Sequence, residues 1–203
     1  MRIVVISPES ADPREAAAME GLFVGGLEFY HVRKPAWSAA DLEAWLGRLP
    51  RAWRPRIILH GHPALAGNLG LGGWHEGDRG DGAATAGFSR SCHDLPSLRR
   101  HLAAHRAILF GPVFPSITKP GYGPRPGFPW DELASLLKGD RAKTGARVLA
   151  IGGVTAAGLV RCRELGFDGA AVMGAVWSEP DPVGAYAVIR DAAARLEAER
   201  HAA

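Results

Sequence analysis

Four of the eight histidines fall at or just after the end of a predicted strand. They are His31, His60, His75 and His93, and His62 lies two residues beyond His60. An imidazole titrates near neutral pH, so it can take up and return a proton, and its neutral form can bind Zn²⁺. In a parallel barrel the carboxyl ends of the strands meet at one rim, where we expect these side chains to converge. For any one histidine alone, a half-buried packing role is the alternative.

Two glycine-containing turns follow the last two predicted strands. They read I-G-G-V-T at 151–155 and G-A-A-V-M-G-A at 169–175. Glycine lets a backbone approach a ligand closely, and a helix N-terminus presents unpaired N–H groups. The pattern predicts a phosphate site, although such turns also occur for packing alone. The residues expected in the site are Gly152, Gly153, Val172, Met173 and Gly174.

A long loop at 111–127 follows the sixth predicted strand and exceeds the usual length of a strand-to-helix connection. Its prolines restrict it and its glycines can hinge it, as a lid over a site requires. Lys119 and Arg125 in the loop could meet an anion. The alternative is an irregular surface loop.

Cys92 and His93 are adjacent and resemble a nucleophile–base pair. Neighbouring residues on a strand point to opposite faces, so we expect Cys92 in the core and His93 at the rim. Two cysteines, Cys92 and Cys162, are too few for a disulfide framework. A reduced, cytoplasmic protein is therefore expected.

Short apolar runs alternate with helical patterns along the whole chain, which predicts a single (β/α)8 TIM barrel over residues 1–203. A doubly wound open sheet uses the same units and is the rival fold. Ser38, with Asp41 three residues on, predicts a capped helix start. The expected strands are 2–7, 27–32, 56–60, 69–75, 83–88, 107–111, 147–151 and 169–173. The expected helices are 13–23, 38–49, 63–67, 94–105, 130–138, 155–165 and 182–199.

The composition of the 203 residues is that of an ordinary globular chain, with 47% hydrophobic and 22% charged residues. No apolar window approaches the length of a membrane span, and the N-terminal apolar run is too short for a signal peptide. The formal net charge is only +3 and the arginines are scattered, so neither a membrane nor a nucleic acid is expected as partner.

Five segments resemble the thiamine-phosphate synthase/TenI family, in the family's order and over nearly the whole chain. The specific segment is F-G-P-V-F-P-S-I-T-K-P-G-Y-G at 110–123. The others are Y-H-V-R-K-P at 30–35, S-R-S-C-H at 89–93, A-I-G-G-V at 150–154 and G-F-D-G-A-A-V-M-G at 166–174. The resemblance implies a barrel, usually a homodimer, that holds thiazole phosphate at its rim.

Synthases of this family join hydroxymethylpyrimidine diphosphate to thiazole phosphate, using Mg²⁺ on two Asp residues and an R-x-K pair. Here His60-Gly61 stands for the synthase-like N-D, and G-G-W-H-E-G at 72–77 lacks the Asp of D-G-V-H-L-G. Asp78 and Asp81 are the only matches for the later Asp, and neither is in clean register. Histidines in place of carboxylates do not suit Mg²⁺, which speaks against this transferase chemistry.

The resemblance is closer to the TenI-like branch, whose thiazole tautomerases move a proton within a carboxylated thiazole phosphate. This isomerase chemistry needs a phosphate site and a general acid/base, with no metal or other cofactor; Mg²⁺ is expected only in a synthase. His93 matches the acid/base histidine of that branch. The residues expected to bind substrate are His31, Arg33, Lys34, His75, Ser116, Thr118 and Lys119.

Two other functions stay open from the residues alone. His60, His62, His75 and His93, with Glu76 or Asp78, could bind Zn²⁺ for hydrolysis. A non-catalytic protein that binds thiazole phosphate would keep the glycine turns but not need His93.

Overall fold

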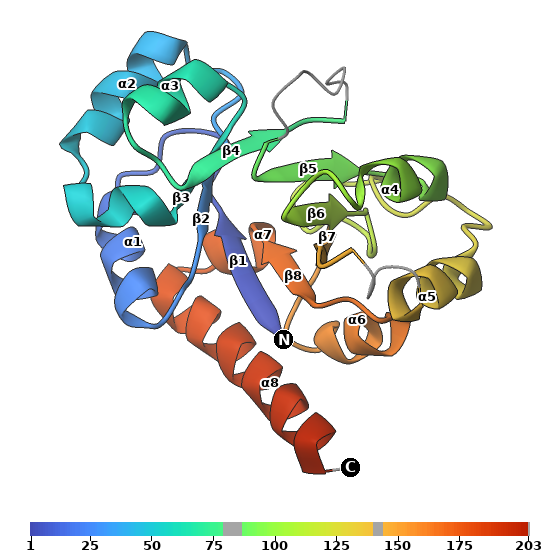
Figure 1. The fold of residues 1–203 in the computed structure, drawn as a ribbon. Coiled ribbons are helices and arrows are strands. Elements are labelled where there is room, and N and C mark those ends of the chain that lie inside the picture. Colours follow the sequence, from blue (N-terminus) through green and yellow to red (C-terminus); the bar gives the residue numbers. More distant parts are fainter. Residues whose placement is uncertain (79–86, 140–143, 203) are drawn as a thin grey trace.

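The computed structural model describes residues 1–78, 87–139 and 144–202, and its eight strands close into one parallel barrel (Figure 1). Each strand pairs with the next along the chain, and the last pairs with the first. This topology confirms the predicted (β/α)8 barrel and excludes the open sheet. The strands are β1 (Arg2–Ile6), β2 (Tyr30–Val32), β3 (Ile57–His60), β4 (Gly73–Glu76), β5 (Ser89–Cys92), β6 (Ala107–Phe110), β7 (Arg147–Ile151) and β8 (Gly169–Val172).

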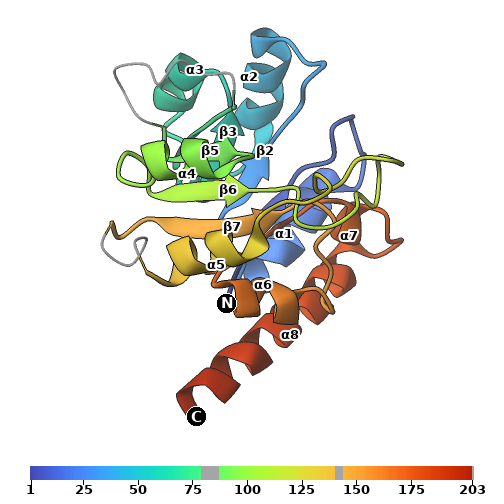
Figure 2. The same cartoon turned by 90° about the vertical axis from the view of Figure 1, so that its right-hand side faces the viewer.

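Helices surround the barrel, and Figure 2 shows the loops after β1 and β6 at one end of it. The start of the second helix is as predicted: Ser38 Oγ accepts from the Asp41 N–H, and the Asp41 carboxylate accepts from the Ser38 N–H. In the described chain no helix is long and apolar enough to cross a membrane. The helices are α1 (Glu15–Val24), α2 (Ala39–Arg48), the 3₁₀ helix η1 (Arg51–Arg56), α3 (Pro63–Asn68), α4 (Leu95–His101), α5 (Trp130–Lys138), α6 (Leu159–Leu165), α7 (Gly174–Trp177) and α8 (Pro182–Ala202).

The fifth strand lies later in the chain than the predicted 83–88. Residues 83–86 lie outside the described residues, 87–88 are not strand, and β5 begins at Ser89. Ser89 and Ser91 bond to His75 inside the barrel, while Arg90 pairs with Glu76 outside it. A strand with polar residues on both faces has no apolar run to reveal it. The strands predicted at 27–32 and 69–75 are also shorter, and begin at Tyr30 and Gly73.

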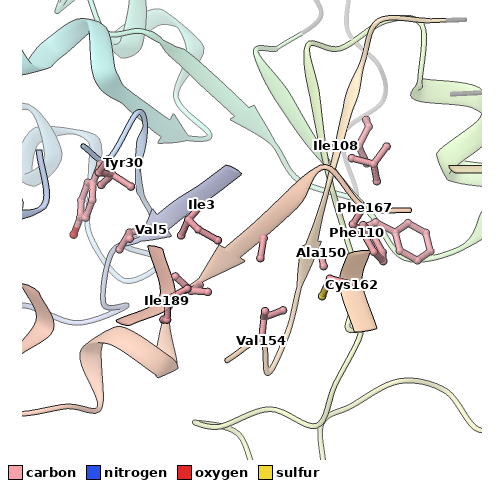
Figure 3. Close-up of a cluster of buried hydrophobic side chains, with 14 of the residues drawn as sticks. Ile3, Val5, Tyr30, Ile108, Phe110, Ala150, Val154, Cys162, Phe167 and Ile189 are labelled. Atoms are coloured by element: carbon pink, nitrogen blue, oxygen red, sulfur yellow. The ribbon is translucent and has the colours of Figure 1, made fainter. Parts of the chain in front are cut away.

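Two hydrophobic clusters hold the barrel together. The larger one lies between strands and helices; Figure 3 shows Val5, Phe110 and Cys162 among its members. Inside the barrel, the strands β1, β6, β7 and β8 supply apolar side chains, whereas β2 to β5 supply mainly polar ones, with Ile58 of β3 as an apolar member. The apolar residues are Val4, Ile6, Leu109, Leu149 and Ala171. The polar residues are His31, His60, His75, Ser89 and Ser91. The polar half of the interior therefore lies next to the predicted site.

Candidate active site

Two cavities, of about 750 Å³ and about 670 Å³, lie side by side at the carboxyl ends of the strands. All of the predicted site residues except His31 line the smaller one. Those lining it are Arg33, Lys34, His75, His93, Ser116, Thr118, Lys119, Gly152, Gly153, Val172, Met173 and Gly174. The loop at 111–127 thus covers the smaller cavity with Ser116 to Lys119. Arg125, by contrast, lines the larger cavity beside α4 and α5, away from Lys119.

His93 follows β5 directly and is held in one orientation. Its Nδ1 contacts the carbonyl oxygen of Gly111. A carbonyl can only accept, so Nδ1 carries the hydrogen and Nε2 is the basic nitrogen. Nε2 lies 3.9 Å from the Asp78 carboxylate, and one third of the side chain is exposed. His93 therefore presents the lone pair of Nε2 at the cavity.

Cys92 points away from this cavity, as its place on the strand predicts. The residue is fully buried in the outer core, and burial raises the pKa of its thiol. A buried neutral thiol is a poor nucleophile. This confirms Cys92 as a core residue.

Glu9 joins two cations at the mouth of the cavity. One of its carboxylate oxygens pairs with the Arg33 guanidinium and also accepts from Lys119 Nζ at 2.7 Å. The hydrogen bond from Lys119 and then that from Arg33 lower the pKa of Glu9, against the opposing effect of burial. The three charges sum to +1, which suits an anionic ligand. Sequence reasoning missed Glu9, although its place just after the first strand was the available signal.

Lys34 lines the cavity, as predicted, but its ammonium is held by acceptors within the protein. Its ammonium donates to the carbonyl oxygens of Pro8 at 2.7 Å and Ser10 at 2.9 Å, and to the Glu15 carboxylate. Tyr30 donates to the other oxygen of Glu15 at 2.8 Å. An ammonium has three N–H groups, and all three are used inside a fully buried side chain. A substrate contact of Lys34 therefore stays a prediction, and its N–H groups already have acceptors within the protein.

Three histidines meet inside the barrel beneath the cavity. His31 Nδ1 lies 3.2 Å from His60 Nε2, and the rings of His60 and His75 stack at 4.1 Å between centroids. Ser89 Oγ and Ser91 Oγ each lie 2.8 Å from a ring nitrogen of His75. Burial lowers the pKa of His31 to about 3 and lowers those of His60 and His75 well below the usual value. All three rings are therefore neutral at pH 7.

Of the four histidines predicted for a Zn²⁺ hydrolase, His60 and His75 meet, whereas His62 and His93 do not join them. His62 is exposed beyond the end of β3, and His93 is bound to Gly111. Among the described residues, the histidines whose ligand atoms lie within 4.8 Å of one another are His31, His60 and His75. The predicted set with His62 and His93 is thus corrected to one that contains His31.

The two glycine turns lie side by side because Ile151 pairs with Ala171 in the barrel. In the described part of the chain, the N–H groups of Gly153 and Gly174 have no hydrogen-bond acceptor. Gly153 also has a φ of +64°, and a Cβ there would lie 2.1 Å from the Pro115 carbonyl oxygen. Packing against the 111–127 loop therefore requires this glycine, whether or not a phosphate binds.

The residues at the cavity do not fit the Mg²⁺ that a synthase would use. Within the described ranges, the carboxylates that line it are Glu9 and Asp78, and Glu9 already holds two cations. Glu76 is buried on the outer side with Arg90 and His105. Asp81 lies outside the described residues. Mg²⁺ prefers an octahedral set of oxygen ligands, which these residues do not supply.

Comparison with known proteins identifies the family. The family described as thiamine monophosphate synthase matches residues 3–176. The chain belongs to the thiamine monophosphate synthase family. It is 31% identical to a thiamine-phosphate synthase of Chromobacterium violaceum over 197 residues, which cover 90% of this chain and 91% of that one. It is 33% identical to a thiamine-phosphate synthase of Halorhodospira halophila over 178 residues, covering 82% and 81%.

A solved structure shares the fold of this family member. The thiamine phosphate pyrophosphorylase from Bacteroides thetaiotaomicron superposes with a TM-score of 0.77. The match covers 95% of this chain and 98% of that chain at 24% identity. The resemblance to the family stated from the sequence is thus confirmed, whereas membership of the TenI-like branch stays a prediction.

Proposed function

We propose that this chain is an enzyme of thiamine biosynthesis that binds a thiazole phosphate in the 670 Å³ cavity. Family membership and the names of the relatives support this substrate class. The cavity offers Arg33 and Lys119 for anionic groups, and the unpaired N–H groups of Gly153 and Gly174 suit a phosphate. A homodimer and a cytoplasmic location belong to the same proposal.

Of the reactions known in the family, the geometry supports proton transfer by His93 best. The observation that carries it is the contact of His93 Nδ1 with the Gly111 carbonyl, which leaves Nε2 as the basic nitrogen. Nε2 takes a proton from one carbon of the thiazole and returns it to another, so atoms and charge balance without a co-reactant. Arg33 and Lys119 hold the carboxylate and phosphate of the substrate meanwhile. This reaction is the tautomerisation of a carboxylated thiazole phosphate.

Coupling of a pyrimidine diphosphate to the thiazole phosphate is the second candidate. The comparisons favour it more directly than tautomerisation, because the relatives described above are named synthases. The donor set at the cavity weighs against it, because the described carboxylates Glu9 and Asp78 do not form a Mg²⁺ site. The names of the relatives thus favour coupling, whereas the groups that line the cavity favour tautomerisation of the same thiazole phosphate.

One experiment separates the two reactions. The protein is given a carboxythiazole phosphate tautomer and followed by NMR, beside a coupling assay with hydroxymethylpyrimidine diphosphate and Mg²⁺. Tautomer exchange that is lost in His93→Gln supports the proposal. Thiamine phosphate formation without tautomer exchange would establish the coupling reaction instead. Phosphate binding without either activity would leave a non-catalytic binding protein.

A further inference from the structure

The polar half of the barrel interior contains three imidazoles from three neighbouring strands. His31, His60 and His75 come from β2, β3 and β4, and His60 pairs directly with His75 in the register. Their ligand atoms all lie within 4.8 Å of one another. His31 and His75 are buried, and His60 is half-buried beneath the cavity. None of the three is used in the proton transfer proposed for His93.

The arrangement of two of these rings already has the dimensions of a metal site. Zn²⁺ binds histidine nitrogens at about 2.0–2.1 Å, which places two nitrogens of a tetrahedral site about 3.3 Å apart. His31 Nδ1 and His60 Nε2 lie 3.2 Å apart. With no metal, one of these nitrogens must carry a hydrogen; with a metal, both lone pairs can face the ion. The ligand atom of His75 lies within 4.8 Å of the other two, so that ring turns toward them when an ion binds.

The surroundings of His75 and the space above the rings suit a bound ion. A metal-binding histidine usually bonds through its other ring nitrogen to a neighbouring group, which orients the ring. Ser89 Oγ, 2.8 Å from His75 Nδ1, is placed to do this. His75 Nε2 lies 2.8 Å from Ser91 Oγ, and a bound ion would replace this contact. His60 and His75 line the cavity, so its solvent or a ligand atom can take the open position. Three protein ligands and one open position form the usual catalytic type of Zn²⁺ site.

We propose that His31, His60 and His75 bind one divalent transition-metal ion of the Zn²⁺ or Co²⁺ type at the base of the cavity. Nitrogen ligands select such ions over Mg²⁺, which prefers oxygen. The site goes beyond the proposed proton transfer and departs from the metal-free protein expected from the sequence. It stands on the geometry of the three rings, so it can be tested whether or not a thiazole substrate is found.

The test uses the full chain, stripped with a chelator and titrated with Co²⁺ and with Zn²⁺. We expect one equivalent of Co²⁺ to give visible ligand-field bands and one equivalent of Zn²⁺ to displace it. His60→Gln and His31→Gln should weaken binding by more than about 10-fold. His62→Ala is the matched control, because His62 is exposed two residues from His60 and should bind as the wild type does.

A second measurement on wild-type protein guards against variants that fail to fold. With ¹⁵N-labelled imidazoles, Zn²⁺ should shift the ring signals of three of the eight histidines and no others. The proposal is overturned if less than one equivalent binds, or if His62→Ala weakens binding as much as His60→Gln. Shifts confined to other histidines would overturn it as well. An activity assay is not needed for any of these outcomes.

Discussion

His93 donates its Nδ1–H to the carbonyl oxygen of Gly111, the first residue of the loop that follows β6. This contact joins the end of β5 to the loop that covers the cavity. The loop then pairs with β7, since Val113 donates to the Ile151 carbonyl at 2.9 Å. The orientation of His93 thus depends on a segment that also contributes Ser116, Thr118 and Lys119 to the cavity.

Replacing His93 tests its role in proton transfer. We expect His93→Gln to lower the turnover of thiazole tautomerisation by about 10²- to 10⁴-fold, because general acid/base groups contribute that much. Affinity for the thiazole phosphate should change little. NMR exchange rates and calorimetric binding measure the two effects. Cys92→Ala should keep wild-type turnover, since its side chain faces the outer core. Wild-type turnover in His93→Gln would refute the assignment.

Glu9 pairs with both Arg33 and Lys119, so we expect it to compete with an anionic ligand for them. Glu9→Gln should therefore tighten the binding of inorganic phosphate or thiazole phosphate by about 2- to 5-fold, the range of a partly exposed ion pair. Arg33→Gln and Lys119→Gln should each weaken it. Isothermal titration at fixed ionic strength measures all three. Weaker binding in Glu9→Gln would show that Glu9 organises the cations for the ligand instead of competing with it.

The lowered pKa of Glu9 also makes stability depend on pH. Hydrogen bonds from Lys119 and Arg33 favour the charged carboxylate in the folded state, so its pKa lies below the usual 4.5. A group with a lowered folded pKa adds stability above its unfolded pKa and loses it as the pH falls through the folded pKa. Wild type should thus unfold at higher denaturant than Glu9→Gln at pH 6, with the difference vanishing well below pH 4.5. A difference that grows on acidification would contradict this sign.

Lys34 should matter for stability more than for ligand affinity. Lys34→Met leaves the Glu15 carboxylate buried without its cation, which typically costs about 3–5 kcal/mol. Adding Glu15→Gln should recover much of the loss, because no uncompensated charge is then buried. Urea unfolding of the single and double variants measures both effects. Weakened ligand binding at unchanged stability would instead support Lys34 as a substrate-binding residue.

The proposed phosphate site can be tested at Gly174 with less disturbance of the neighbouring loop than at Gly153. Gly174→Val should weaken phosphate binding by about 10-fold or more, because the added side chain blocks the approach of a charged ligand to the backbone N–H groups. The atoms nearest to a Cβ at Gly174 are side-chain atoms of Ile117 and Thr118, at 3.0 Å, which must give way slightly. At Gly153 a Cβ meets the Pro115 carbonyl, so Gly153→Val should disturb the loop as well. Circular dichroism and phosphate titration separate the two effects; unchanged affinity in Gly174→Val would remove the site.

The barrel fold and the residues at its rim could be predicted from the sequence, because both follow from the order of short segments along the chain. Apolar runs of strand length alternate with helical patterns, and a residue just past a parallel strand lies at the rim of a barrel wherever the strand sits. His93, Ser116, Lys119 and Gly153 could be assigned in this way, and each lines the cavity. The fifth strand could not, since its serines and arginine find partners on other strands.

Only the tertiary structure decided which of these groups face each other. Glu9 and Lys119 meet across 110 residues, and Lys34 is turned inward to Glu15 while its neighbour Arg33 faces the cavity. His31 lies beneath His60 because β2 pairs with β3 in one register, which a local pattern does not contain. The position of a residue along a strand can be read directly from the sequence. The interaction partners and the burial of each side chain follow instead from strand register and from packing between distant segments. Register and packing therefore determine which charged groups are free for a ligand.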